Sequence, residues 1–243
     1  MRHTFATMGT VASITLDRDV SEQTLAEVER TFTGYDRVFS LYRDDSMLSA
    51  IARGDIPLED APRRVRDEYE RATAWRERTG GWFTPHRPDG VIDLSGTVKA
   101  AAIDAAGALL AATGAHGLLG VGGDIVVVGE GPQHIGIVDP ADRSRMVADV
   151  ELGRRRAGAT SGSAERGDHI WSRLGATDIV QVTVLADDIV TADVLATAIV
   201  AAGTGFMGEL LDGLDVDALV FAGDEVLATP GWPRVEELSA RRD

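Results

Sequence analysis

The pattern of apolar residues changes near Gly114, and this change limits the folds open to the chain. Between residues 21 and 113, apolar side chains recur at helical spacing, which predicts helices over about 21–39, 62–79 and 97–113. After Gly114 the chain is rich in Val and Ile, in short runs that are typical of strands. We expect these strands at about 117–129, 134–139, 147–152, 179–186, 218–223 and 225–229.

The order of these elements predicts an α+β fold. A first strand is expected from Thr4 to Leu16, three helices follow it, and a single helix, Asp188–Gly203, interrupts the later strands. Such an order favours a mostly antiparallel sheet over alternating α/β units. The 243 residues contain no repeat, linker or low-complexity segment, so we expect one domain over residues 1–243.

Charge and composition exclude several classes of function. The formal net charge is −15, which argues against a nucleic-acid partner, and the lack of cysteine excludes disulfides, thiolate metal sites and a Cys nucleophile. A phosphate-bearing ligand would need a local cation or a helix N-terminus to offset the negative field. No apolar run is long enough to span a bilayer and the N-terminus lacks the apolar core of a signal peptide, so we expect a cytoplasmic protein.

Asp193 is an unusual residue in the apolar helix expected at 188–203. A buried carboxylate is unfavourable unless it is paired, and Thr197, four residues later, lies on the same helix face. Together they offer two hard oxygen ligands of the kind that Mg²⁺ prefers. The alternative is structural, with Asp193 completing the first helical turn and Thr191 as the N-cap.

Two glycine-containing segments could bind an anion. Residues 120–129, GVGGDIVVVG, resemble a dinucleotide fingerprint only loosely, because a strand and not a helix follows the glycines. Residues 90–104 form a strand-to-helix turn whose backbone N–H groups suit an anion, and Lys99 follows in the helix. A bulge or tight turn in the first segment and an exposed lysine in the second remain open as alternatives.

The remaining polar segments carry weaker signals. The Ser-, Thr- and Gly-rich run over residues 156–170 predicts a loop, which could hold phosphate or ribose. The five histidines have no metal-ligand spacing, and no G-x-S-x-G segment indicates a hydrolase triad.

Seven short segments occur in the order found in one known family. They are M-G-T (8–10), S-L-Y (40–42), D-L-S-G-T-V-K (93–99), G-G-D (122–124), A-T-S-G (159–162), H-I (169–170) and A-D-V-L-A-T-A (192–198). The chain therefore resembles the ApbE family of flavin transferases, the FAD:protein FMN transferases, from about Phe5 to Gly203. The resemblance implies an ApbE-like, T-fold-like α+β architecture of two intimately joined subdomains with FAD between them.

The resemblance also implies an activity. Members bind FAD with Mg²⁺, cleave its diphosphate, attach FMN to a Thr or Ser hydroxyl of a target protein and release AMP. An FAD pyrophosphatase that yields FMN and AMP, and an FAD-binding protein without turnover, are the alternatives.

Carried over by position, the resemblance implies three groups of site residues. The cofactor-binding positions are Met8, Tyr42, Phe83, Thr84, Asp93, Lys99, Gly122, Gly123, Asp124, Ser161, Gly162, His169 and Ile170. The Mg²⁺ positions are Gly96, through its carbonyl, Asp193 and Thr197, with Ala196 beside them. His169 and Asp193 are the expected catalytic residues.

The chain departs from the family pattern in three places. His169-Ile170 lacks the Asp-Pro that usually follows, Thr84 stands where an FAD-contacting aspartate is usual, and Ala100 replaces the glycine after Lys99. The segment between the second helix and Asp93 is also shorter than is typical. We therefore expect cofactor binding to be retained more securely than transfer to an acceptor.

Overall fold

The computed structural model describes residues 1–142, 144–162 and 177–232. Its strands are β1 (Arg2–Thr7), β2 (Thr10–Leu16), β3 (Gly117–Val121), β4 (Asp124–Val128), β5 (Gln133–Val138), β6 (Met146–Leu152), β7 (Ala157–Gly162), β8 (Ile179–Ala186), β9 (Asp217–Ala222) and β10 (Glu225–Ala228). Its helices are α1 (Glu22–Phe39), α2 (Met47–Ala52), α3 (Arg63–Arg78), α4 (Ser95–Ala111), α5 (Ile189–Ala202) and α6 (Thr204–Leu211), with a 3-10 turn at Leu58–Asp60.

Eight strands form one sheet in the order β1-β2-β3-β4-β7-β8-β9-β10, and β5 and β6 form a separate two-stranded sheet. Neighbouring strands pair antiparallel throughout the described residues. The chain leaves the sheet after β2, runs through helices α1 to α4, and returns at β3, which pairs with β2. The predicted α+β fold with an antiparallel sheet is confirmed.

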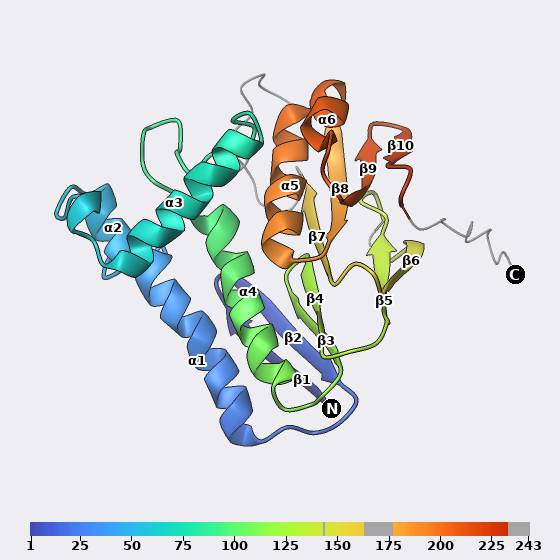
Figure 1. Ribbon diagram of the computed structural model, residues 1–243, viewed down its shortest axis with the longest axis horizontal. Helices are drawn as coiled ribbons and strands as arrows, with labels where there is room; N and C mark the ends of the chain where they lie inside the picture. Colours follow the sequence, from blue (N-terminus) through green and yellow to red (C-terminus); the bar gives the residue numbers. More distant parts are fainter. Residues whose placement is uncertain (143, 163–176, 233–243) are drawn as a thin grey trace, which may run out of the picture.

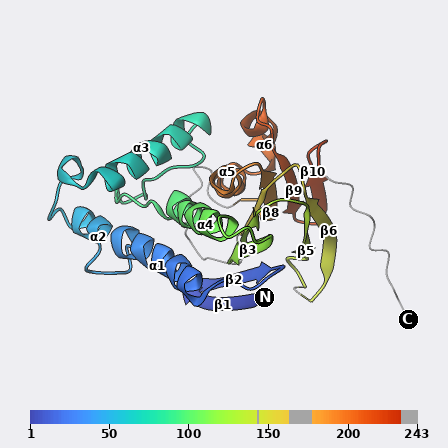
Figure 2. The same ribbon diagram turned by 60° about the horizontal axis from the view of Figure 1, so that its bottom comes forward.

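The large sheet is covered on both faces (Figures 1 and 2). Helices α4 and α5 pack on one face, with α1 and α3 outside α4, and the β5–β6 hairpin covers part of the other face. The alternating burial of β4 follows from this, because Asp124, Val126 and Val128 point toward the helices while Ile125 and Val127 point toward the hairpin. Each face therefore has its own apolar core.

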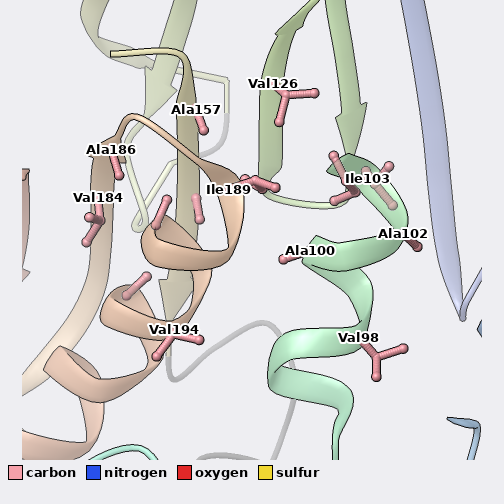
Figure 3. Close-up of a cluster of buried hydrophobic side chains, with 14 of the residues drawn as sticks. Val98, Ala100, Ala102, Ile103, Val126, Ala157, Val184, Ala186, Ile189 and Val194 are labelled. Atoms are coloured by element: carbon pink, nitrogen blue, oxygen red, sulfur yellow. The ribbon is translucent and has the colours of Figure 1, made fainter. Parts of the chain in front are cut away.

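Small side chains let α4 and α5 approach the sheet closely. In Figure 3, Ala100 of α4 points toward α5, Ala102 lies on the opposite side of α4, and Ala157 and Ala186 lie on the strands beside α5. In α5, every residue from Ala192 to Ala202 is buried except Thr197. A helix buried on nearly all sides explains why the sequence of α5 lacks an amphipathic period.

Five local predictions differ from the structure. The segment 117–129, expected as one strand, forms β3 and β4, which pair across a turn at Gly122 and Gly123. Residues 4–16 form a hairpin, because Met8 and Gly9 reverse the chain between β1 and β2. The predicted loop over 156–170 contains β7, whose strand pairing with β4 and β8 outweighs its loop-like composition. The short helices α2 and α6 were not expected.

The cap of α5 is the fifth difference. Asp188, and not Thr191, is the N-cap, and its carboxylate accepts the Thr191 N–H at 2.8 Å. At α1, by contrast, the predicted start is confirmed, since the Ser21 side chain accepts the Thr24 N–H at 3.1 Å. No helix in the described part of the chain combines the length and the apolar character that crossing a bilayer requires.

Candidate active site

A cavity of about 1230 Å³ opens at one end of the large sheet. This volume exceeds the roughly 300–1,000 Å³ usual for small-ligand pockets, which suits an extended ligand. Its walls come from the β1–β2 and β3–β4 turns, the C-terminal end of α1 and the loop after it, the start of α4, the β5–β6 hairpin, and β7 with β8. Its lining includes Met8, Gly9, Asp36, Tyr42, Arg43, Arg87, Asp93, Ser95, Lys99, Gly122, Gly123, Ile137, Thr160, Gln181 and Thr183.

Two tight hairpin turns bring backbone to the cavity. Met8 and Gly9 have φ values of 46° and 74°, as both central residues of a type I′ turn require, and Met8 is the only non-glycine residue with positive φ in the described part of the chain. Gly122, in the β3–β4 turn, has a φ of 61° and donates its N–H to the Val11 carbonyl at 3.2 Å. The two turns are thus tied side by side.

Gly123 marks a close approach of two strands. A Cβ at this position would lie 2.9 Å from the carbonyl oxygen of Thr160, whose N–H donates to the Gly123 carbonyl at 3.0 Å. The Thr160 hydroxyl in turn lies 2.9 Å from that of Thr183 on β8. Backbone and hydroxyl groups therefore form the polar floor of the cavity.

The N-terminus of α4 forms another wall. Asp93 accepts the Ser95 N–H at 2.9 Å, while Leu94, at the N-cap position, provides no side-chain cap. The helix is anchored from outside by Glu68 of α3, which accepts the Thr97 hydroxyl at 2.6 Å. A helix N-terminus that faces a cavity favours a negatively charged ligand.

A buried charge cluster lies beside this wall. The Lys99 Nζ is 2.6 Å from Asp124 Oδ2 and 3.6 Å from Asp193 Oδ2, and the three side chains are 9%, 0% and 5% exposed. They come from α4, β4 and α5, so the packing of these elements brings them together. Lys99 is therefore buried rather than solvent-exposed, and it is the side chain that pairs with Asp193.

The residues around Asp193 fit a magnesium ion. Within the described residues Asp193 Oδ2 is buried and accepts no hydrogen bond, and Thr197, one turn later, is the only position of 192–202 that is not buried. No group of three or more His, Asp or Glu residues gathers in the ranges that the structure describes. Such a group is unnecessary, because Mg²⁺ commonly takes one or two carboxylates and obtains its other ligands from phosphates and water.

Two cavity arginines were not found by sequence reasoning. The guanidinium of Arg43 lies 2.9 Å from the carboxylate of Asp45 and 3.8 Å from that of Asp36. The hydrogen bond that it donates to Asp45 raises the pKa of Arg43 above its ordinary value. Arg87 pairs with Asp89 at 3.1 Å. The Nε of each arginine is buried and donates no hydrogen bond to a described residue. Their only sequence signal is position, directly after S-L-Y and before the 93–99 segment.

The structure brings together part of the predicted site. Met8, Tyr42, Asp93, Lys99, Gly122 and Gly123 line the cavity, and Asp124 and Asp193 contact Lys99. Phe83 does not line it: the ring is buried, and a Cβ on Gly96 would lie 2.7 Å from it, so the pair packs α4 against the chain before it.

Several other predicted residues lie away from the lining. Thr84 accepts the His86 N–H at 3.2 Å, and Ala196 is fully buried in α5. Ser161 and Gly162 are the last residues of β7, where they pair with Val182 and Gln181 of β8. His169 and Ile170 lie outside the described residues.

Comparison with solved structures identifies the fold. The ApbE protein of Thermotoga maritima matches with a TM-score of 0.81 and 21% identity, over 95% of this chain and 97% of that one. The flavin transferase ApbE of Vibrio cholerae matches with a TM-score of 0.73 and 21% identity, over 94% and 96%. The apo flavinyl transferase ApbE of Pseudomonas stutzeri matches with a TM-score of 0.76 and 20% identity, over 94% and 93%.

A comparison with family models addresses the sequence itself. No curated protein gives a significant match to the chain. The model of the ApbE family matches residues 84–220, which is more than half of the chain and includes Lys99, Asp124 and Asp193. The chain therefore belongs to the ApbE family.

Proposed function

We propose that this protein is a Mg²⁺-dependent FAD:protein FMN transferase. The observation that carries the proposal is the pairing of Asp193 with Lys99, which lines a large cavity, in a chain of the ApbE family. The acceptor is the hydroxyl of a Thr or Ser on a separate protein. Its oxygen forms a bond to the phosphorus of the FMN half, the bond from that phosphorus to the bridging oxygen breaks, and AMP leaves with that oxygen.

The cavity residues provide binding and orientation. The Gly122–Gly123 turn has no side chains to block a ligand, and the start of α4 offers backbone N–H groups to a diphosphate. Arg43 and Arg87 line the cavity and offset locally the field of a chain whose net charge is −15. These groups make the binding of an anionic dinucleotide to an acidic protein physically reasonable.

Asp193 and Thr197 would hold the magnesium ion, with Gly96 the expected backbone ligand. The ion supplies charge neutralisation at the diphosphate as the P–O bond breaks. The acceptor hydroxyl must also lose a proton, and His169 and the nearby aspartates are the candidate bases. Asp36 and Asp93 are the carboxylates that line the cavity within the described residues.

The test measures the AMP that is released and the flavin that becomes covalently bound to the acceptor protein. Purified protein is incubated with FAD, with and without Mg²⁺, and with and without an acceptor protein that carries an exposed Thr or Ser. AMP that requires both Mg²⁺ and acceptor, together with a fluorescent flavin bound covalently to the acceptor, supports the transferase. AMP without acceptor would identify an FAD pyrophosphatase instead, and FAD binding without AMP under all conditions would identify a flavin carrier.

The Asp193→Asn variant tests the metal assignment. We expect AMP release to fall by about 100-fold, the order found when transition-state charge stabilisation is removed, with a higher Mg²⁺ requirement. Asp67→Asn, an exposed position on α3, makes the same charge change and should retain wild-type activity. Wild-type turnover by Asp193→Asn at low Mg²⁺ would overturn the assignment.

A further inference from the structure

The ammonium group of Lys99 lies between two carboxylates. Its Nζ is within 2.6 Å of Asp124 Oδ2 and 3.6 Å of Asp193 Oδ2. Lys99 is buried in the second turn of α4, and a buried ammonium is unfavourable unless it is paired, so its position needs compensation from nearby negative charge. Asp124 and Asp193 supply that compensation from β4 and α5.

The cluster keeps an excess negative charge. The side chains of Lys99, Asp124 and Asp193 together carry a formal charge of −1, and all three are almost fully shielded from water. Charges in such surroundings interact more strongly than they do at the surface. The closer ion pair of Lys99 is with Asp124. Asp193, whose Oδ2 accepts no hydrogen bond from the residues that the structure describes, is therefore the carboxylate available to another cation.

We propose that Lys99 is a positioning residue that acts as an internal counter-cation between Asp124 and Asp193, so that a divalent cation binds tightly only when a diphosphate arrives. The proposal rests on the proposed function and names a regulatory feature of the same site. Without a ligand, the ammonium neutralises one carboxylate and weakens the attraction for Mg²⁺. Because Lys99 also lines the cavity, an incoming diphosphate adds negative charge beside the ammonium and restores that attraction.

This arrangement predicts opposite effects for two substitutions. Lys99→Met removes the ammonium and leaves two buried carboxylates, with a formal charge of −2. Asp124→Asn leaves Lys99 and Asp193, with a formal charge of zero. A purely structural ion pair predicts a different result, in which both substitutions lower stability and neither raises metal affinity.

The experiment is a calorimetric titration of Mg²⁺ alone into the ligand-free full chain. We expect affinity to increase in the order Asp124→Asn, wild type, Lys99→Met, with steps of at least about tenfold at an effective dielectric constant near 20. Arg63→Met and Asp67→Asn make the same charge changes at exposed positions on α3 and should leave the affinity within about twofold of wild type.

A second titration tests the coupling to the ligand. Saturating FAD should raise the Mg²⁺ affinity of the wild type at least about tenfold, and should raise that of Lys99→Met by a smaller factor. Circular dichroism and thermal unfolding verify that each variant is folded. If Lys99→Met does not fold, Asp124→Asn carries the test, and its affinity must be lower than that of the wild type.

The outcomes separate this proposal from the proposed function. Affinity of Lys99→Met equal to or below that of the wild type overturns the counter-cation role, even where FAD turnover is normal. Tighter binding by Lys99→Met supports that role, even where the wild type releases no AMP and the transferase proposal fails. Unchanged affinity in Asp124→Asn would likewise count against the role of Lys99.

Discussion

At the scale of single residues, the site depends on positions where no larger side chain fits. Gly123 faces the backbone of Thr160 across two paired strands, and Gly122 occupies a positive-φ position in the same turn. Gly96 has the same role at α4, where the Phe83 ring packs against its Cα. The close packing of these backbones holds the cavity floor and the start of α4 in fixed positions.

Gly123→Ala should destabilise the protein by about 1–3 kcal/mol, because the new methyl group would lie against a backbone oxygen that cannot rotate away. Chemical denaturation measures the change. Gly208→Ala, in the exposed face of α6 with no atom near its Cβ position, should instead stabilise by up to about 1 kcal/mol. A neutral Gly123→Ala would mean that β4 and β7 can separate without loss.

At the scale of elements, α5 places Asp193 beside Lys99, which lines the cavity. The helix is almost entirely buried, so its apolar residues fix its rotation, and beyond its first turn only Thr197 is not buried. Asp188 determines where the helix begins, since its carboxylate accepts both the N–H and the hydroxyl of Thr191. The cap therefore helps to set the position of Asp193 one turn later.

Asp188→Ala should lower the free energy of unfolding by about 1 kcal/mol, the usual effect of losing an N-cap. Asp188→Asn keeps an acceptor oxygen and should remain close to the wild type. Urea denaturation of the three proteins distinguishes the cases. Equal losses in both variants would assign the effect to the charge of Asp188 rather than to capping.

The junction between β2 and β3 predicts a pH effect. The Asp17 carboxylate accepts hydrogen bonds from the side chain of Arg18 and from the backbone N–H of His116. These hydrogen bonds lower the pKa of the Asp17 carboxyl to about 2. Because the folded pKa is depressed, this stabilisation is present above the unfolded pKa of about 3.9 and is lost as the pH falls toward 2.

Asp17→Asn should therefore reduce stability near pH 6 and flatten the dependence of stability on pH between about 4 and 2. Thermal unfolding of both proteins across this range provides the measurement. Parallel curves for the wild type and the variant would show that Asp17 does not contribute to acid unfolding.

At the scale of the whole molecule, a net charge of −15 opposes the approach of an anionic dinucleotide. The cavity cations act at short range, whereas the overall charge acts over a Debye length of about 30 Å at 0.01 M salt and about 8 Å at 0.15 M. Added salt therefore screens the repulsion more than it screens contacts inside the cavity.

We expect the association rate of FAD, measured by stopped-flow fluorescence at fixed Mg²⁺, to increase severalfold between 0.01 and 0.15 M ionic strength. The dissociation rate should change less. A rate that decreases with salt would show that the field of Arg43, Arg87 and Lys99 governs the approach of the ligand.

The sequence by itself determined most elements of this protein. Helical spacing indicated α1, α3 and α4, runs of Val and Ile indicated most strands, and the order of these elements indicated an α+β fold. These signals are local, because they depend on side chains a few residues apart. The order of short motifs in turn pointed to the family, which the family match over residues 84–220 then showed.

The tertiary structure decided what depends on contacts between distant segments. Residues 157–162 form a strand because β4 and β8 offer hydrogen-bond partners that their composition does not reveal. Lys99 is buried because β4 and α5 place two carboxylates around its ammonium. The partner of Asp193 lies far away along the chain, and only the packing of α4 against α5 brings the two charges together.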